Sequence, residues 1–151
     1  MSEVRGADSN ESRECSDALD AEGYVLGMPD ANGIVAKCAA DAQVYGVAQK
    51  STKHPITGTA EADKEVGVLR APKFAMVQYN NGVGETISVG SLLSMKGANA
   101  AGCCREHSWT TWAAGTGTER KTLVGIALEA KAQSTSGLVK CILLCPSFPM
   151  Q

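Results

Sequence analysis

The sequence predicts an all-β protein, and three observations support this class. Six short runs rich in Val, Ile, Leu and Thr recur along the chain, at residues 33–39, 65–71, 74–80, 85–93, 122–130 and 138–144. Turn signals lie beside several of them, namely the stretches PDANG, YNNGVG and STSG. The 16 glycines occur at frequent intervals, which suits tight turns between short strands. A chain of 151 residues is long enough for one domain with a real core.

The N-terminal segment, residues 1–22, differs from the rest in charge. It holds seven acidic and two basic residues, a balance of −5, whereas the rest holds nine acidic and twelve basic residues, a balance of +3. So polar a segment buries little of itself. We therefore predict an extended acidic arm at 1–22 and a single β domain at 23–151. The arm either folds back on its own body or lies along a neighbouring subunit, and we favour the second interpretation.

The β domain contains an internal pseudo-repeat. The stretches VLRAPKFAM and ILLCPSFPM share the pattern Pro-x-Phe-x-Met, which aligns Pro72 with Pro146, Phe74 with Phe148 and Met76 with Met150. Upstream, Gly46 aligns with Gly125 and, more weakly, Gly27 aligns with Gly90. We predict structurally equivalent β units at about residues 23–76 and 85–150, with the two prolines at the ends of matching strands.

Unequal spacing between the aligned residues places insertions in each copy. Extra residues fall within 51–64 of the first copy and within 103–119 of the second copy. Both insertions are expected to be loops. Residues 119–133 alone would suit an amphipathic helix. Their alignment with the first copy favours a hairpin instead, with strands at 122–130 and 138–144.

The chain lacks features of a membrane protein. No apolar run approaches the roughly 18 residues that a membrane span requires, and the polar N-terminus does not resemble a signal peptide. Basic residues are scattered and no aromatic residues interleave them. We therefore expect synthesis in the cytoplasm and no membrane or nucleic-acid partner.

Few residues suit catalysis or metal binding. His54 and His107 lie in the two separate insertions, without a recognisable nucleophile motif, and no phosphate-binding loop occurs. Cys103, Cys104 and His107 lie within five residues and could supply zinc ligands. Adjacent cysteines lack the usual Cys-x-x-Cys spacing, however, and no fourth ligand is evident. The sequence therefore predicts no catalytic, cofactor-binding or metal-binding residues, and no enzyme.

The cysteines and tryptophans allow structural interpretations. Without a signal peptide, the six cysteines are expected to be buried free thiols, and Cys141 and Cys145 should face the same side of a strand. Trp109 and Trp112 lie in a polar segment of the second insertion. They serve either as a lid on the core or as anchors of an interface, and both interpretations remain open.

The C-terminal half resembles a known family. The stretch LVGIALEAKAQSTSGLVKCILL, preceded by GETISVGSLLSMKGANAAG, is similar to the C-terminal half of tailed-phage head-decoration, or capsid cement, proteins. The similarity is clearest over residues 85–144 and looser over 23–76. The insertion at 103–119, with its tryptophans and cysteines, departs from the family pattern.

This resemblance implies a small β-barrel or β-tulip subunit that forms a homotrimer. Such a subunit binds the major capsid protein on the outside of the phage head, stabilises the shell, and uses no cofactor. The expected location is therefore the virion, at the capsid surface. Two alternatives stay open: a tail, spike or host-binding component of the virion, and a small β-barrel enzyme or ligand-binding domain.

Overall fold

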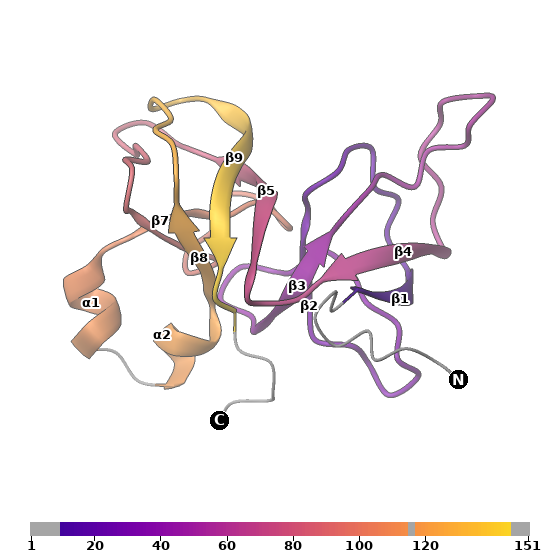
Figure 1. The fold of residues 1–151 in the computed structure, drawn as a ribbon, viewed down its shortest axis with the longest axis horizontal. Helices are drawn as coiled ribbons and strands as arrows, with labels where there is room; N and C mark the ends of the chain where they lie inside the picture. Colours follow the sequence, from indigo (N-terminus) through magenta and orange to yellow (C-terminus); the bar gives the residue numbers. More distant parts are fainter. Residues whose placement is uncertain (1–9, 115–116, 146–151) are drawn as a thin grey trace.

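The protein contains two antiparallel β-sheets, which confirms the all-β class (Figure 1). A computed structural model describes residues 10–114 and 117–145. The first sheet has the strand order β1-β4-β3-β2 and the second has β5-β9-β8-β6-β7. The strands of the first sheet are β1 Asn10–Cys15, β2 Val25–Gly27, β3 Val44–Ala48 and β4 Lys64–Leu69. Those of the second sheet are β5 Lys73–Asn80, β6 Leu92–Ser94, β7 Arg105–His107, β8 Leu123–Ala127 and β9 Ser136–Leu143.

Two short helices follow β7. They are α1 Trp109–Ala114 and α2 Gly117–Lys121, and they lie at one end of the second sheet in Figure 1. The second predicted insertion therefore contains one strand and two helices rather than only a loop. The hairpin predicted from residues 122–144 is confirmed, because β8 and β9 pair antiparallel and Ile126 lies opposite Ile142.

Strands β5 and β9 show why this sequence forms a sheet with one buried face. Side chains alternate between the two faces of a strand. In β5 the side chains of Ala75, Val77 and Tyr79 are buried, while Phe74 and Met76, which alternate with them, are exposed. Strand β3 is buried throughout because apolar residues cover both of its faces.

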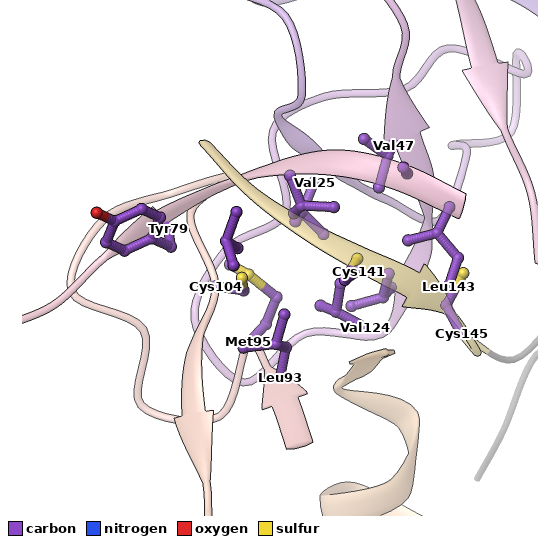
Figure 2. Close-up of a cluster of buried hydrophobic side chains, with 14 of the residues drawn as sticks. Val25, Val47, Tyr79, Leu93, Met95, Cys104, Val124, Cys141, Leu143 and Cys145 are labelled. Carbon is purple, nitrogen blue, oxygen red and sulfur yellow. The ribbon is translucent and has the colours of Figure 1, made fainter. Parts of the chain in front are cut away.

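Two hydrophobic clusters hold the fold together. The larger cluster joins Val25, Val44 and Val47 of the first sheet to many residues of the second sheet, so the sheets share a core (Figure 2). The smaller cluster lies on the other face of the first sheet and includes Leu19 and Leu26. Within the described residues, the strand orders do not close either sheet into a barrel.

The two sheets pair their strands in the same register. Once β7 is set aside, each sheet places its first, fourth, third and second strands side by side. Leu26 lies opposite Gly46 and Leu93 opposite Gly125, and in both sheets the register shifts directly after this pair. A Cβ atom at Gly46 would lie 2.5 Å from the carbonyl oxygen of Leu69 in β4. At Gly125 it would lie closer still to the carbonyl oxygen of Ile142 in β9.

The remaining pairs follow this register. Val25 opposite Val47 corresponds to Leu92 opposite Ile126, and Val47 opposite Leu69 corresponds to Ile126 opposite Ile142. The paired positions of β2, β3 and β4 therefore have matching positions in β6, β8 and β9.

The boundary between the sheets differs from the predicted boundary between the copies. Phe74 and Met76, expected at the end of the first copy, lie in β5 of the second sheet. Pro72 lies between the end of β4 and the start of β5, and the side chain of Phe74 is exposed. The matching residues Pro146, Phe148 and Met150 lie outside the described residues.

The prediction that residues 1–22 form an arm apart from the β domain is wrong for residues 10–22. Strand β1 pairs with β4 along its whole length, and Cys15 and Leu19 are fully buried. The acidic character of this segment misled the prediction, because Glu11 points into a network of its own body. Its carboxylate accepts hydrogen bonds from Tyr45 Oη (2.7 Å), Arg13 Nε (2.7 Å) and Arg70 Nη1 (2.9 Å).

Candidate functional site

The residues considered for a zinc site do not come together. Cys104 is fully buried in the larger cluster, beside Met95 and Cys141 in Figure 2, whereas Cys103 is half-buried. His107 is the last residue of β7, and its Nε2 is 2.9 Å from Glu119 Oε2 of α2. Among residues 10–114 and 117–145, no group of three His, Cys, Asp or Glu side chains has the arrangement to hold a metal ion.

The two histidines both have structural contacts. Nδ1 of His54 accepts hydrogen bonds from the backbone N–H groups of Ile56 (3.1 Å) and Thr57 (3.3 Å), which closes the turn between β3 and β4. His107 joins β7 to α2 through Glu119. The structure therefore keeps the histidines in separate places, as their positions in two insertions predicted.

The six cysteines are not paired with one another, and five of them are buried. Burial raises the pKa of Cys38 and of Cys141 to about 12, and it raises that of Cys104 well above its usual value. Such thiols hold almost no thiolate at neutral pH. Cys141 and Cys145 both point into the larger cluster, in agreement with their predicted common side.

Trp109 lies at the start of α1, with 47% of its surface exposed. Its Nε1 donates a hydrogen bond of 3.1 Å to the carbonyl oxygen of Gly90, next to the exposed Val89. This contact ties α1 to the turn before β6. The side chain of Trp112 lies outside the described part of the structure.

The most pronounced surface feature is an open apolar face on the second sheet. It lies opposite the core, because side chains alternate between the two faces of a strand. Residues directly across from each other on antiparallel strands share a face. We define it as the side chains of Phe74, Met76, Ile126, Ile142 and Leu144. Phe74, Met76 and Leu144 are exposed, and both isoleucines are half-buried.

One row of residues shows where this face is covered. Leu92, Ile126, Ile142 and Phe74 lie directly opposite one another across four strands, and exposure rises from 1% at Leu92 to 69% at Phe74. His107 lies opposite Leu92 at the other end of the row and contacts Glu119 of α2. The inserted segment therefore covers one half of the face, and the half around Phe74 is open.

The corresponding face of the first sheet is already an interface. Its residues all pack in the larger cluster against the second sheet, and they are Val25, Val44, Val47, Leu69 and Ala71. In the common register these positions match Leu92, Leu123, Ile126, Ile142 and Leu144. The matching face is thus covered by protein in the first sheet and partly open in the second.

A groove of about 350 Å³ runs beside the open apolar face, at the seam between the sheets. Ala48 and Leu69 of the first sheet form one wall, and residues 74–76 of β5 form the other. The charged residues Glu22, Lys50 and Lys140 also line it. Among the ion pairs of the described residues, none includes Lys50 or Lys140.

Sequence reasoning did not identify this site. The Pro-x-Phe-x-Met pattern drew attention to Phe74 and Met76 only as aligned positions of a repeat, and not as members of an exposed face. The available signal was their spacing. Two large apolar residues at i and i+2 alternate with Ala75 and Val77, so both faces of this strand are apolar, and each face needs a covering layer or a partner.

No helix within the described residues is both long and apolar enough to cross a membrane. Comparison with protein-family models and with curated proteins found no match to this chain.

Proposed function

We propose that this protein is a non-enzymatic structural component of a virus particle, a decoration protein that binds the major capsid protein on the outside of a phage head. The open apolar face of the second sheet carries the proposal. Large exposed apolar patches on soluble proteins mark sites of association, and this one spans three neighbouring strands of a rigid sheet. The resemblance of residues 85–144 to capsid cement proteins supports the choice of partner.

The proposal includes self-association as a homotrimer located on the capsid. We further propose that the two sheets are copies of one repeated unit, which the shared register and the shared position of Gly46 and Gly125 support. A trimer would then present six related sheets to the shell. The β-tulip architecture implied by the resemblance belongs to this proposal as well.

The role assigned to the N-terminal arm changes in this proposal. Residues 10–22 belong to the folded body and are not available as a separate tether. Attachment therefore depends on the open apolar face, with residues 1–9 as the part of the arm that remains to be tested by deletion.

Copurification tests the proposed function. The full-length chain should copurify in stoichiometric amounts with the major capsid protein of the particle that carries it, and the free chain should have the mass of a trimer or become trimeric on the shell. The double variant Phe74→Ser/Leu144→Ser should lower its occupancy on the shell about tenfold. Ile56→Ser is the matched control, because Ile56 is exposed in the loop between β3 and β4 and is not part of the open apolar face. Absence of copurification would contradict the proposal.

A further inference from the structure

Strand β5 is one of the two edge strands of the second sheet, and part of its edge faces the seam groove. An edge strand presents a row of N–H and C=O groups to any chain that lies beside it. Which groups of β5 point toward the groove follows from the hydrogen bonds of its neighbour β9.

The groups of Met76 point toward the groove. Lys140 lies opposite Met76 in β9, but it directs its own backbone groups to the far side. Its N–H donates to Glu129 Oε1 (2.9 Å), and its carbonyl oxygen accepts from the N–H of Leu128 (2.8 Å). In an antiparallel ladder, opposed residues that do not bond each other both point their groups outward. The N–H and C=O of Met76, and by the period of two those of Phe74, therefore face away from β9.

The next position along the edge shows that it accepts a partner. The N–H of Gln78 donates a hydrogen bond of 2.8 Å to the carbonyl oxygen of Gly23, whose own N–H donates to the carbonyl oxygen of Ala48 at 2.9 Å. Gly23 thus occupies the edge at Gln78 and joins the two sheets. A Cβ atom on Gly23 would lie 2.8 Å from the carbonyl oxygen of Met76, so Gly23 also covers that oxygen. The open part is therefore the stretch from Phe74 to the N–H of Met76, which leaves room for about three residues of an added strand.

The surroundings of this edge define what would bind there. Phe74 and Met76 give apolar contacts to side chains on one face of an added strand, and Leu69 and Ala48 give them on the groove wall. Lys50 and Lys140 flank the groove and have no ion-pair partner among the described residues, whereas Glu22 is the one acidic residue in the lining. The balance of +1 favours a segment that carries carboxylates.

We propose that the seam groove binds an extended segment of a partner polypeptide, with alternating apolar and acidic residues, which pairs with Phe74 and Met76 as an added β-strand. Backbone hydrogen bonds supply affinity in this mode, and side-chain contacts supply specificity. The inference rests on the proposed function and names its attachment element: the partner is the major capsid protein, and the segment is one of its extended stretches.

Hydrogen exchange tests the backbone pairing directly. Exchange measured on the free and the particle-bound full-length chain should slow at least about tenfold on binding for the amides of Phe74 and Met76. The loop around Val83, which is also exposed, should not change. If these two amides exchange at the same rate in both states while the chain remains bound, the added strand does not form and the inference is overturned, although the proposed function stands.

Charge reversal tests the acidic character of the partner. Lys50→Glu/Lys140→Glu should weaken attachment about tenfold, whereas Lys64→Glu, an exposed lysine of β4, should leave it unchanged. Equal effects of both variants would contradict the predicted carboxylate contacts.

A photo-crosslinking residue in place of Phe74, with Ile56 as the control position, identifies the occupant in purified particles. The expected crosslink joins Phe74 to an extended stretch of the capsid protein. A crosslink to a second copy of this chain, including its residues 1–9 or 146–151, would overturn the inference. Failure of the chain to copurify with a shell would overturn both the inference and the proposed function.

Discussion

The two sheets pair their strands alike and differ in the side chains at matching positions. Where the second sheet has Ala75, Val77, Val124 and Leu143 in the shared core, the first sheet has Glu11, Arg13, Tyr45 and Arg70. The ring of Tyr45 lies between the two guanidinium groups, with Arg70 Cζ 3.6 Å and Arg13 Cζ 5.2 Å from its centroid. The first sheet thus has a polar network at the positions where the second sheet packs apolar side chains into the shared core.

On the other face of each sheet, the first sheet is the one that packs into the shared core. The first sheet buries Val25, Val44 and Val47 against the second sheet, while the second leaves Ile126 and Ile142 half-covered at matching positions. The strand register therefore does not determine which face a sheet buries. The side chains determine it, and the open face of the second sheet matches the face that the first sheet buries against protein.

The largest expected effect comes from removing β1. Deletion of residues 1–22 strips the edge of β4 and removes Cys15 and Leu19 from the smaller cluster, so we expect a loss of about 5 kcal/mol or more in the free energy of unfolding. Urea denaturation followed by circular dichroism measures this. Deletion of residues 1–9 alone retains β1 and the other strands of the described residues, and it serves as the control. Unchanged stability of the longer deletion would show that the first sheet does not need β1.

Substitution of the two matched glycines tests the shared register. Gly46→Ala and Gly125→Ala each force a Cβ against a carbonyl oxygen of the neighbouring strand, and we expect losses of about 2 and about 3 kcal/mol, the larger at Gly125. Gly27→Ala is the matched control, because its Cβ would meet only ordinary contacts of 3.6 Å or more. If only one of the two glycines is sensitive to substitution, they are not equivalent in packing.

A matched pair of core substitutions sharpens the contrast between the faces. Val47→Ala should cost about 2 kcal/mol, because Val47 is fully buried between the sheets. Ile126→Ala, at the equivalent position, should cost only about 1 kcal/mol in the free chain although it removes a larger side chain, because Ile126 is half-exposed. Thermal unfolding of both variants measures the difference. Equal losses would mean that the open face is covered in solution.

The smallest effect concerns the polar network of the first sheet. Burial raises the pKa of Glu11, but hydrogen bonds from Tyr45, Arg70 and Arg13 outweigh burial and hold the pKa below its usual value of 4.5. A lowered folded-state pKa stabilises the fold above pH 4.5, and this contribution is lost as the pH falls through the folded value.

Glu11→Gln should therefore cost about 1 kcal/mol at pH 7 and flatten the loss of stability below pH 4.5. Solvent screens part of the charge effect, because about a third of the Glu11 side chain is exposed. Chemical denaturation from pH 3 to pH 7 gives both measurements. An unaltered acid limb in the variant would assign the pH dependence to other carboxylates.

The sequence allowed the class and the hairpin to be predicted, because alternation of apolar residues and turn chemistry are local signals. The sequence pattern also aligned Gly46 with Gly125. At both positions a neighbouring strand lies too close for a Cβ atom. The place of β1 was missed because Glu11 and Arg13, although only half-buried, bind Tyr45 far along the chain, and composition does not reveal such pairing. The open face was missed for a related reason: whether Phe74 is covered depends on the distant inserted segment.

The buried thiols make each core measurable from within. Cys15 lies in the smaller cluster, while Cys38 and Cys141 lie in the larger one, contributed by the two halves of the chain. With pKa values of about 12, Cys38 and Cys141 hold only about one thiolate in 10⁵ molecules at pH 7, so an alkylating reagent reaches them only after the core opens. The rates at which the three cysteines are labelled would therefore report whether the halves separate together or the first sheet opens alone.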